Sequence, residues 1–285
     1  MIILALNLFI SEYYGLFIVR GLALVMSIKG AFTFFDLLGY SVMIKRHSFL
    51  ELFMNYFRFK LTLPLFSLIF SGLVFGVPEG AITTLTVQSN DIKKYVSHMK
   101  NNPETFEALD SDVAGVCVTR SGNNYAGEMF VWNAFPSLEK ALGMIEQYDP
   151  ANPAPAYDDL RSVKYAAVYK PLKEFDLDPG FERLWRLKLN DEMAFASKMV
   201  ELEAAIRKAG NEINLALFAP VGGGIHETGM YHFRAIFKSG TDAGKVLDQF
   251  YDGASFSPIW MDAQKYVDEI ISETIEMCEI IYTAK

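Results

Sequence analysis

Two stretches of the chain carry the same succession of hydrophobic and polar patterns. In the first, a β-branched run at residues 81–87 predicts a strand, and Asn90 is a candidate helix cap directly after it. Apolar residues then recur from Ile92 to Met99 at the i, i+3, i+4, i+7 spacing of one helix face. The further elements predicted here are strands at 113–120, 128–135 and 163–169, a helix from Ser137 to about Tyr148, and a short helix near 157–160.

The second stretch repeats this order. Apolar residues from Phe195 to Ile206 mark its first helix, and the glycine-containing segment 221–226 predicts a flexible hairpin turn. Pro171 and Pro179 mark residues 171–181 as the linker between the two stretches. The other elements predicted are strands at 184–189, 213–219, 229–237 and 274–282, and helices near 242–251 and 259–271.

Short matches between the stretches indicate an internal duplication. The segment 129–135 aligns with 230–236 at an offset of 101, and this alignment equates Trp132 with Phe233. Asn90-Asp91 aligns with Asn190-Asp191 at an offset of 100, and Tyr148-Asp149 aligns with Tyr251-Asp252 at an offset of 103. Ordered matches at nearly one offset are the signature of a repeat with small loop insertions.

Each stretch has the βαββαβ order of the ferredoxin-like unit. Its four-stranded sheet has both helices on one face, so the other apolar face needs a cover, and the sister copy is the natural one. Two such units, each with a short extra helix before its last strand, resemble the dimeric α/β-barrel superfamily, which includes the antibiotic-biosynthesis-monooxygenase-like proteins. We therefore predict an α+β fold in which two tandem ferredoxin-like repeats, 77–170 and 182–285, pack sheet to sheet as an intramolecular α/β barrel.

The resemblance also bears on the two cysteines, Cys117 and Cys278. In the superfamily's strand order 4-1-3-2, strand 2 of one unit borders strand 4 of the other. Cys117 falls on strand 2 of the first repeat and Cys278 on strand 4 of the second, so the resemblance implies that they could be neighbours. A disulfide that closes the barrel and two separate buried thiols both stay open, because a disulfide needs particular geometry.

Residues 54–76 have the pattern of a signal peptide. Arg58 and Lys60 precede an apolar run at 61–75, and Val74 and Gly76 are small or modest residues where a signal peptidase would cut. Three interpretations of the hydrophobic extension 1–53 stay open: upstream sequence that is not normally made, a membrane anchor, and a packed soluble extension. Under the first two interpretations, the part of the chain after residue 76 lies outside the cytoplasm. It is then either a periplasmic or secreted protein, or it is anchored to the membrane through residues 1–76.

Charge excludes one class of partner. The first 76 residues hold six basic and three acidic side chains, so the remainder of the chain has 20 basic and 31 acidic ones and a net charge of −11. Such a body repels phosphate backbones, and we expect no nucleic-acid partner. A homodimer stays open.

Misplaced polar residues on the predicted strand 229–237 mark the candidate site. Alternation puts His232 and Arg234 on one face and an apolar set on the other. His232 is a candidate general base or metal or haem ligand, and Arg234 a candidate anion binder; a purely structural role is the alternative for both. Asn133, Arg120 and Trp185 are weaker candidates for substrate contacts. No zinc spacing, nucleophile elbow, dinucleotide fingerprint, P-loop or covalent haem motif is present in the sequence.

Three functions follow as hypotheses. The chain could be an enzyme, cofactor-free or haem-associated, that oxidises or isomerises an apolar or aromatic molecule. It could instead be a non-catalytic exported ligand-binding or stress-related protein, or a membrane-tethered interaction protein. The cofactor and the small-molecule ligand stay unassigned, because this fold supports many chemistries.

Overall fold

The computed structural model describes residues 77–150 and 155–285, which form the two repeats and the linker between them. The predictions for 1–53 and 54–76 lie outside the described residues. The elements of the first repeat are β1 (Ala81–Gln88), α3 (Ile92–Asn101), α4 (Glu104–Ala108), β2 (Val113–Ser121), β3 (Glu128–Phe135), α5 (Leu138–Gln147), η1 (Pro155–Tyr157) and β4 (Ser162–Pro171).

The second repeat follows the same order, but some of its elements differ from the prediction. A short helix overlaps the predicted turn at 221–226. The helix predicted near 259–271 ends at Ala263, because residues 267–271 belong to the last strand, which begins earlier and is much longer than predicted. The elements are β5 (Phe181–Leu189), α6 (Glu192–Lys208), β6 (Asn214–Gly222), α7 (Gly224–Glu227), β7 (Tyr231–Phe237), α8 (Gly240–Tyr251), α9 (Ser257–Ala263), η2 (Gln264–Tyr266) and β8 (Val267–Thr283).

The long helices begin at side-chain caps. Asp91 accepts a hydrogen bond from the Lys94 amide at the start of α3, so the cap is Asp91 and not Asn90 as predicted. Ser137 and Ser239 cap α5 and α8 in the same way. These side chains satisfy amides that the first helical turn leaves without partners. Within the described residues, none of the helices has the length and apolar character needed to cross a membrane.

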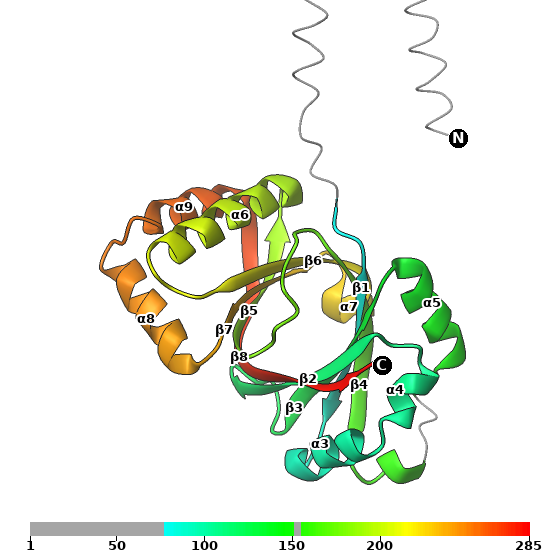
Figure 1. Ribbon diagram of the computed structural model, residues 1–285. Helices are drawn as coiled ribbons and strands as arrows, with labels where there is room; N and C mark the ends of the chain where they lie inside the picture. The colour runs from blue at the N-terminus through cyan, green and yellow to red at the C-terminus, as the bar shows by residue number, and fades with distance from the viewer. Residues whose placement is uncertain (1–76, 151–154) are drawn as a thin grey trace, which may run out of the picture. The chain divides into compact units, whose positions relative to one another are not determined.

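The eight strands close into one barrel in the order β1-β3-β2-β8-β5-β7-β6-β4 (Figure 1). Each repeat contributes the order 4-1-3-2, so the predicted intramolecular barrel of two ferredoxin-like units is confirmed. The repeats meet at two seams. β2 pairs with β8 along most of its length, from Val113 to Ser121, whereas β4 pairs with β6 only from Val168 to Pro171.

Helices cover the outside of the barrel on two sides. In Figure 1, α6, α8 and α9 lie beside the sheet of the second repeat, and α3, α4 and α5 lie beside that of the first. Met129 and Val131 of β3 pack with Tyr95 and Met99 of α3, and Phe233 of β7 packs with Phe195 of α6. The outward strand residues therefore form two helix-covered cores, and the inward ones fill the barrel.

The register shows that the offset of 101 for β3 and β7 is wrong. The capping serines Ser137 and Ser239, which directly follow these strands, are 102 residues apart. With this offset His232 is equivalent to Phe130, and Arg234 is equivalent to Trp132. A slip of one residue exchanges the two faces of a strand. Trp132 therefore lines the barrel interior, whereas Phe233 packs against helices.

Candidate functional site

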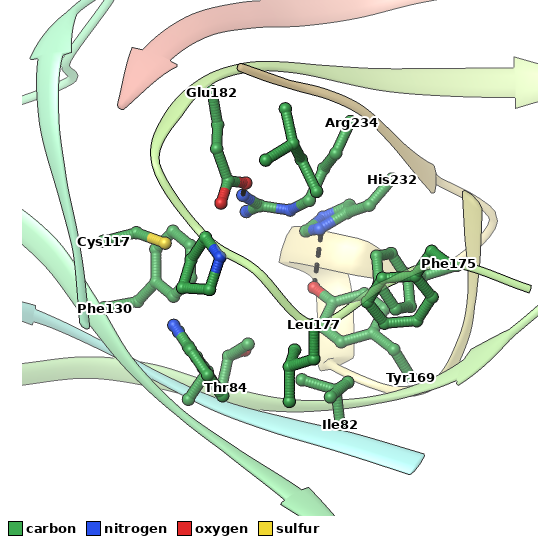
Figure 2. Close-up of a pocket in the computed structure, with 14 residues that line it drawn as sticks. Ile82, Thr84, Cys117, Phe130, Tyr169, Phe175, Leu177, Glu182, His232 and Arg234 are labelled. Carbon is green, nitrogen blue, oxygen red and sulfur yellow. Dashed lines mark hydrogen bonds and ion pairs between the residues drawn. The ribbon is translucent and has the colours of Figure 1, made fainter. Parts of the chain in front are cut away.

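A small cavity lies inside the barrel (Figure 2). Its volume is about 60 Å³. Figure 2 shows His232, Arg234 and Glu182 on one side of this space, with Ile82 and Thr84 across from them. The side chains that line the cavity are Ile82, Thr84, Cys117, Phe130, Trp132, Tyr169, Phe175, Leu177, Pro179, Glu182, Phe218, His232, Arg234 and Ile236.

His232 is held by two partners at one ring nitrogen. Its Nε2 lies 2.8 Å from Glu227 Oε2 and 3.1 Å from the Tyr169 hydroxyl. A carboxylate only accepts hydrogen bonds, so Nε2 carries the ring proton and donates a hydrogen bond to Glu227. In the neutral ring the lone pair is then on Nδ1, the nitrogen that is left to act as an acceptor or base.

Glu227 is the centre of this buried network. It is 1% exposed, and its Oε1 accepts a hydrogen bond from the Tyr165 hydroxyl at 2.7 Å. Arg186 Nε lies 3.2 Å from both carboxylate oxygens, and Arg186 also donates to the Tyr165 hydroxyl. Glu227 is the last residue of α7, so this short helix after the glycine run delivers a carboxylate into the end of the barrel.

Burial and charge separate the protonation states of this pair. Desolvation lowers the pKa of His232 to about 4, against the opposing effect of Glu227. The pKa of Glu227 falls to about 2, because hydrogen bonds and charge from His232 and Arg186 outweigh the desolvation that would raise it. At neutral pH the site therefore holds a neutral imidazole hydrogen-bonded to an ionised carboxylate.

Arg234 lies in a second buried network at the same wall. Its Nη1 contacts Glu182 Oε2 at 2.5 Å and Glu276 Oε2 at 3.0 Å. The Thr274 hydroxyl donates to the other oxygen of Glu276 at 3.1 Å. Burial raises the pKa of Glu182, although Arg234 opposes this. One guanidinium thus serves two carboxylates inside the barrel.

The first repeat supplies part of the apolar wall of the cavity, beside Phe218 and Ile236 of the second repeat and the linker. Phe130 lies under the Arg234 guanidinium, 5.1 Å from it to the ring centroid. Trp132 lies over the backbone of Gly115 on β2, where an added Cβ would come within 2.1 Å of the indole. Any larger residue at position 115 would displace Trp132 from the interior.

The linker closes one end of the cavity. Phe175, Leu177 and Pro179 all line it, and none of these residues belongs to a strand or helix. Lys173 fixes the segment to the second repeat through a buried ion pair with Glu203 at 2.5 Å. The green linker segment crosses the ring of strands in Figure 1.

Three predicted contact residues lie away from the cavity. Asn133 shares the helix-facing side of β3 with Val131, because the face assigned to it by the offset of 101 was wrong; its Oδ1 is buried and meets no donor within the described part of the chain. Arg120 is exposed at the end of β2. Trp185 is stacked on Phe233 at 5.1 Å in the core beneath α6.

The structure joins Cys117 and Cys278 in a disulfide across the β2–β8 seam. Both residues are buried, and Cys117 lines the cavity. The bond links the first repeat to the second next to Glu182 and Glu276.

The sequence did not identify Glu227, Tyr169 or Arg186 as site residues. Glu227 falls between the predicted turn at 221–226 and the predicted strand at 229–237, and Tyr169 and Arg186 lie on strands whose partners become clear only in the closed barrel. A usable signal was the alternation in β5, which puts Glu182, Leu184 and Arg186 on one face of a strand whose other face is apolar except for Arg183.

Comparisons with known proteins give fold likeness only. No family model and no curated protein matches the chain. An anthrone oxidase-like protein is 10% identical, with 72% of this chain and 96% of that chain covered and a TM-score of 0.43. A mutant chlorite dismutase from Candidatus Nitrospira defluvii is 10% identical, with 70% and 90% covered and a TM-score of 0.42. A heme-binding protein from Thermus thermophilus is 9% identical, with 70% and 91% covered and a TM-score of 0.43.

This cavity does not fit a haem. Pockets for drug-sized ligands and cofactors span roughly 300–1,000 Å³, and the cavity here has about 60 Å³. The Nε2 atom of His232 is already bound by Glu227 and Tyr169. On the helix-facing side of β7, Trp185 and Trp260 stack with Phe233 and fill the space between the sheet and the helices.

Proposed function

We propose that this protein binds a small molecule with an apolar body and one polar group inside the barrel. The composition of the cavity wall supports this: most of its side chains are apolar, and His232, Arg234 and Glu182 lie together on one side of it. Binding sites for small molecules combine a largely apolar wall with a few fixed polar groups in this way. The ligand's polar group would face His232 and its apolar body would face Phe130 and Trp132.

The size of the cavity sets a condition on binding. About 60 Å³ holds roughly two water molecules. An aromatic ligand therefore needs Phe175 and Leu177 of the linker to move outward. Both belong to a segment without regular secondary structure, which can move without breaking strand pairing.

Phenol and benzene are suitable probes, because they differ by one hydroxyl group. We expect phenol to bind more tightly than benzene, with a change in Trp132 fluorescence, and His232→Phe to reduce that preference. Leu177→Trp should fill the mouth and abolish binding of both probes, whereas Trp185→Phe, a change in the helix-covered core, should leave binding unchanged. Binding of neither probe, or binding unaffected by Leu177→Trp, would refute the site.

A second candidate is a cofactor-free proton-transfer enzyme of the monooxygenase-like or isomerase-like kind. The observation that favours it is the neutral His232 ring oriented by an ionised Glu227. His232 Nδ1 would accept a proton from the ligand, and Glu227 would stabilise the resulting imidazolium. Exchange of a ligand C–H proton with deuterated solvent, followed by NMR, tests this step, and Glu227→Gln should slow it by about 10²-fold or more. Binding without any exchange leaves the non-catalytic function.

Export is part of the same proposal. The signal-like pattern of residues 54–76 and the disulfide between Cys117 and Cys278 both favour an oxidising compartment outside the cytoplasm. Intact mass of the protein from its native host tests it: a mature chain that starts near Val77 with bonded cysteines is expected. A mass that includes Met1 would refute cleavage of the signal.

A further inference from the structure

Four buried side chains with metal-ligating atoms meet at the β2–β8 seam. They are Cys117, Glu182, Glu276 and Cys278, and one ligand atom from each lies within 4.8 Å of the other three. Each of the four residues is less than 10% exposed. The group is separate from the His232–Glu227 pair, although Cys117 and Glu182 also line the cavity of the proposed function.

We propose that these four residues bind one thiophilic divalent cation, such as Zn²⁺, when the Cys117–Cys278 disulfide is reduced. Two thiolates and two carboxylates are a donor set that zinc accepts in tetrahedral geometry. In the oxidised chain the sulfur atoms are bonded to each other at 2.02 Å. The cation site and the disulfide are therefore mutually exclusive.

The charges at the seam favour a cation. Glu182 and Glu276 share one guanidinium, that of Arg234, in a buried setting. Reduction followed by deprotonation would add two thiolates to this group. A divalent cation would balance them, and buried charges are stable only when they are paired.

Arg234 can remain in place when the cation binds. It contacts the Oε2 atom of each carboxylate, and each carboxylate has a second oxygen. The Thr274 hydroxyl already donates to Oε1 of Glu276. Such outer hydrogen bonds orient carboxylate ligands at many metal sites, so Arg234 and Thr274 would act as orienting groups.

The geometry requires little movement of the backbone. Zinc–sulfur distances of about 2.3 Å place two sulfur ligands roughly 3.8 Å apart in a tetrahedron. Rotation of the two cysteine side chains gives this separation, because Cys117 and Cys278 are directly opposite each other in the β2–β8 ladder. The cation would join the repeats at the same point as the disulfide does.

The change from the disulfide to the cation site needs a reductant, and a dithiol supplies the electrons. A reducing dithiol gives two electrons and two protons to the Cys117–Cys278 bond and becomes a cyclic disulfide. Each cysteine thiol then loses its proton as the cation binds. Two-electron oxidation by a disulfide reverses the sequence and releases the cation.

Cobalt(II) is the probe for the test, because its thiolate complexes absorb in the near ultraviolet. The full chain is reduced with dithiothreitol, freed of reductant without oxygen, and titrated with Co²⁺. We expect one equivalent to bind with a thiolate charge-transfer band, and Zn²⁺ to displace it. The oxidised chain should show no such band.

Variants on β8 separate the ligands from their surroundings. Cys278→Ser should remove most of the band, and Glu276→Gln should weaken cobalt binding at least ~10-fold. Glu273→Gln, three residues earlier on the same strand and partly exposed, is the matched control and should bind as the wild type does. A reduced wild-type chain without the band, whether folded or unfolded by circular dichroism, overturns the proposal. Equal binding by the Glu276 and Glu273 variants overturns the role of the carboxylates.

Discussion

The Cys117–Cys278 disulfide should contribute a large part of the stability of the barrel. The two residues are 161 positions apart in the chain. A crosslink that closes a loop of this length removes unfolded-state entropy worth about 5 kcal/mol at 25 °C, and removal of native disulfides typically costs ~2–5 kcal/mol. We therefore expect Cys117→Ala/Cys278→Ala to lower the free energy of unfolding by about 3–5 kcal/mol. Alanine leaves no unpaired hydroxyl in the seam.

Urea unfolding of the full chain, followed by tryptophan fluorescence and circular dichroism, measures this loss. A chelator in all samples keeps metal ions from replacing the crosslink. The double variant should also show a steeper dependence on urea, because its unfolded state is more expanded. Wild type under reductant is the control and should match it. A loss below about 1 kcal/mol with an unchanged slope would refute the reasoning that loop closure stabilises the seam.

Three further predictions concern the buried groups. The pKa of His232 falls from 6.5 to about 4 on folding, so the unfolded chain takes up this proton at a higher pH than the folded chain does. The free energy of unfolding should therefore fall as the pH drops from about 6.5 to about 4. In urea unfolding, His232→Phe should lose this part of the pH profile, and an unchanged profile would contradict the assignment. Glu227→Gln should cost about 3–5 kcal/mol in the same assay, since it leaves Arg186 buried without an anion, whereas the control Glu269→Gln at an exposed pair should cost less than ~1 kcal/mol. Trp185→Ala should cost about 3–5 kcal/mol without altering phenol affinity, and a loss of affinity would place Trp185 at the ligand site.

The architecture could be predicted from the sequence because the hydrophobic pattern of each repeat indicates the order of its strands and helices. The alternation of strands and amphipathic helices identified two βαββαβ units, and the bare face of each sheet required a partner. Boundaries were less reliable where burial changes along one element. β8 begins at Val267, and its first residues are exposed, so no apolar alternation marked its start.

The candidate site was predicted only in part, and the reason is the register. His232 and Arg234 stood out as polar residues on a strand whose other face is apolar, and the structure places both at the cavity. Asn133 was assigned to their face through an offset one residue too small. β3 is largely apolar on both faces, so sequence matches between β3 and β7 cannot separate an offset of 101 from one of 102. The positions of the helix caps that follow the two strands can.

Glu227 could not be predicted because its role depends on distant parts of the chain. It meets Tyr165 of β4, Arg186 of β5 and His232 of β7 only when the barrel closes. The local sequence around it, with three consecutive glycines, is typical of a loop. Burial of a carboxylate in such a segment becomes visible only in three dimensions.

The two repeats have kept one fold and divided its interior between them. At equivalent positions the first repeat has Ile82, Phe130 and Trp132, and the second has Glu182, His232 and Arg234. The apolar set needs no partners, whereas each member of the polar set has an ion pair or hydrogen bond inside the barrel. Buried ion pairs rarely add stability over well-packed apolar side chains. Packing alone therefore gives no reason for the second repeat to differ from the first, and a role in binding a ligand or a cation does.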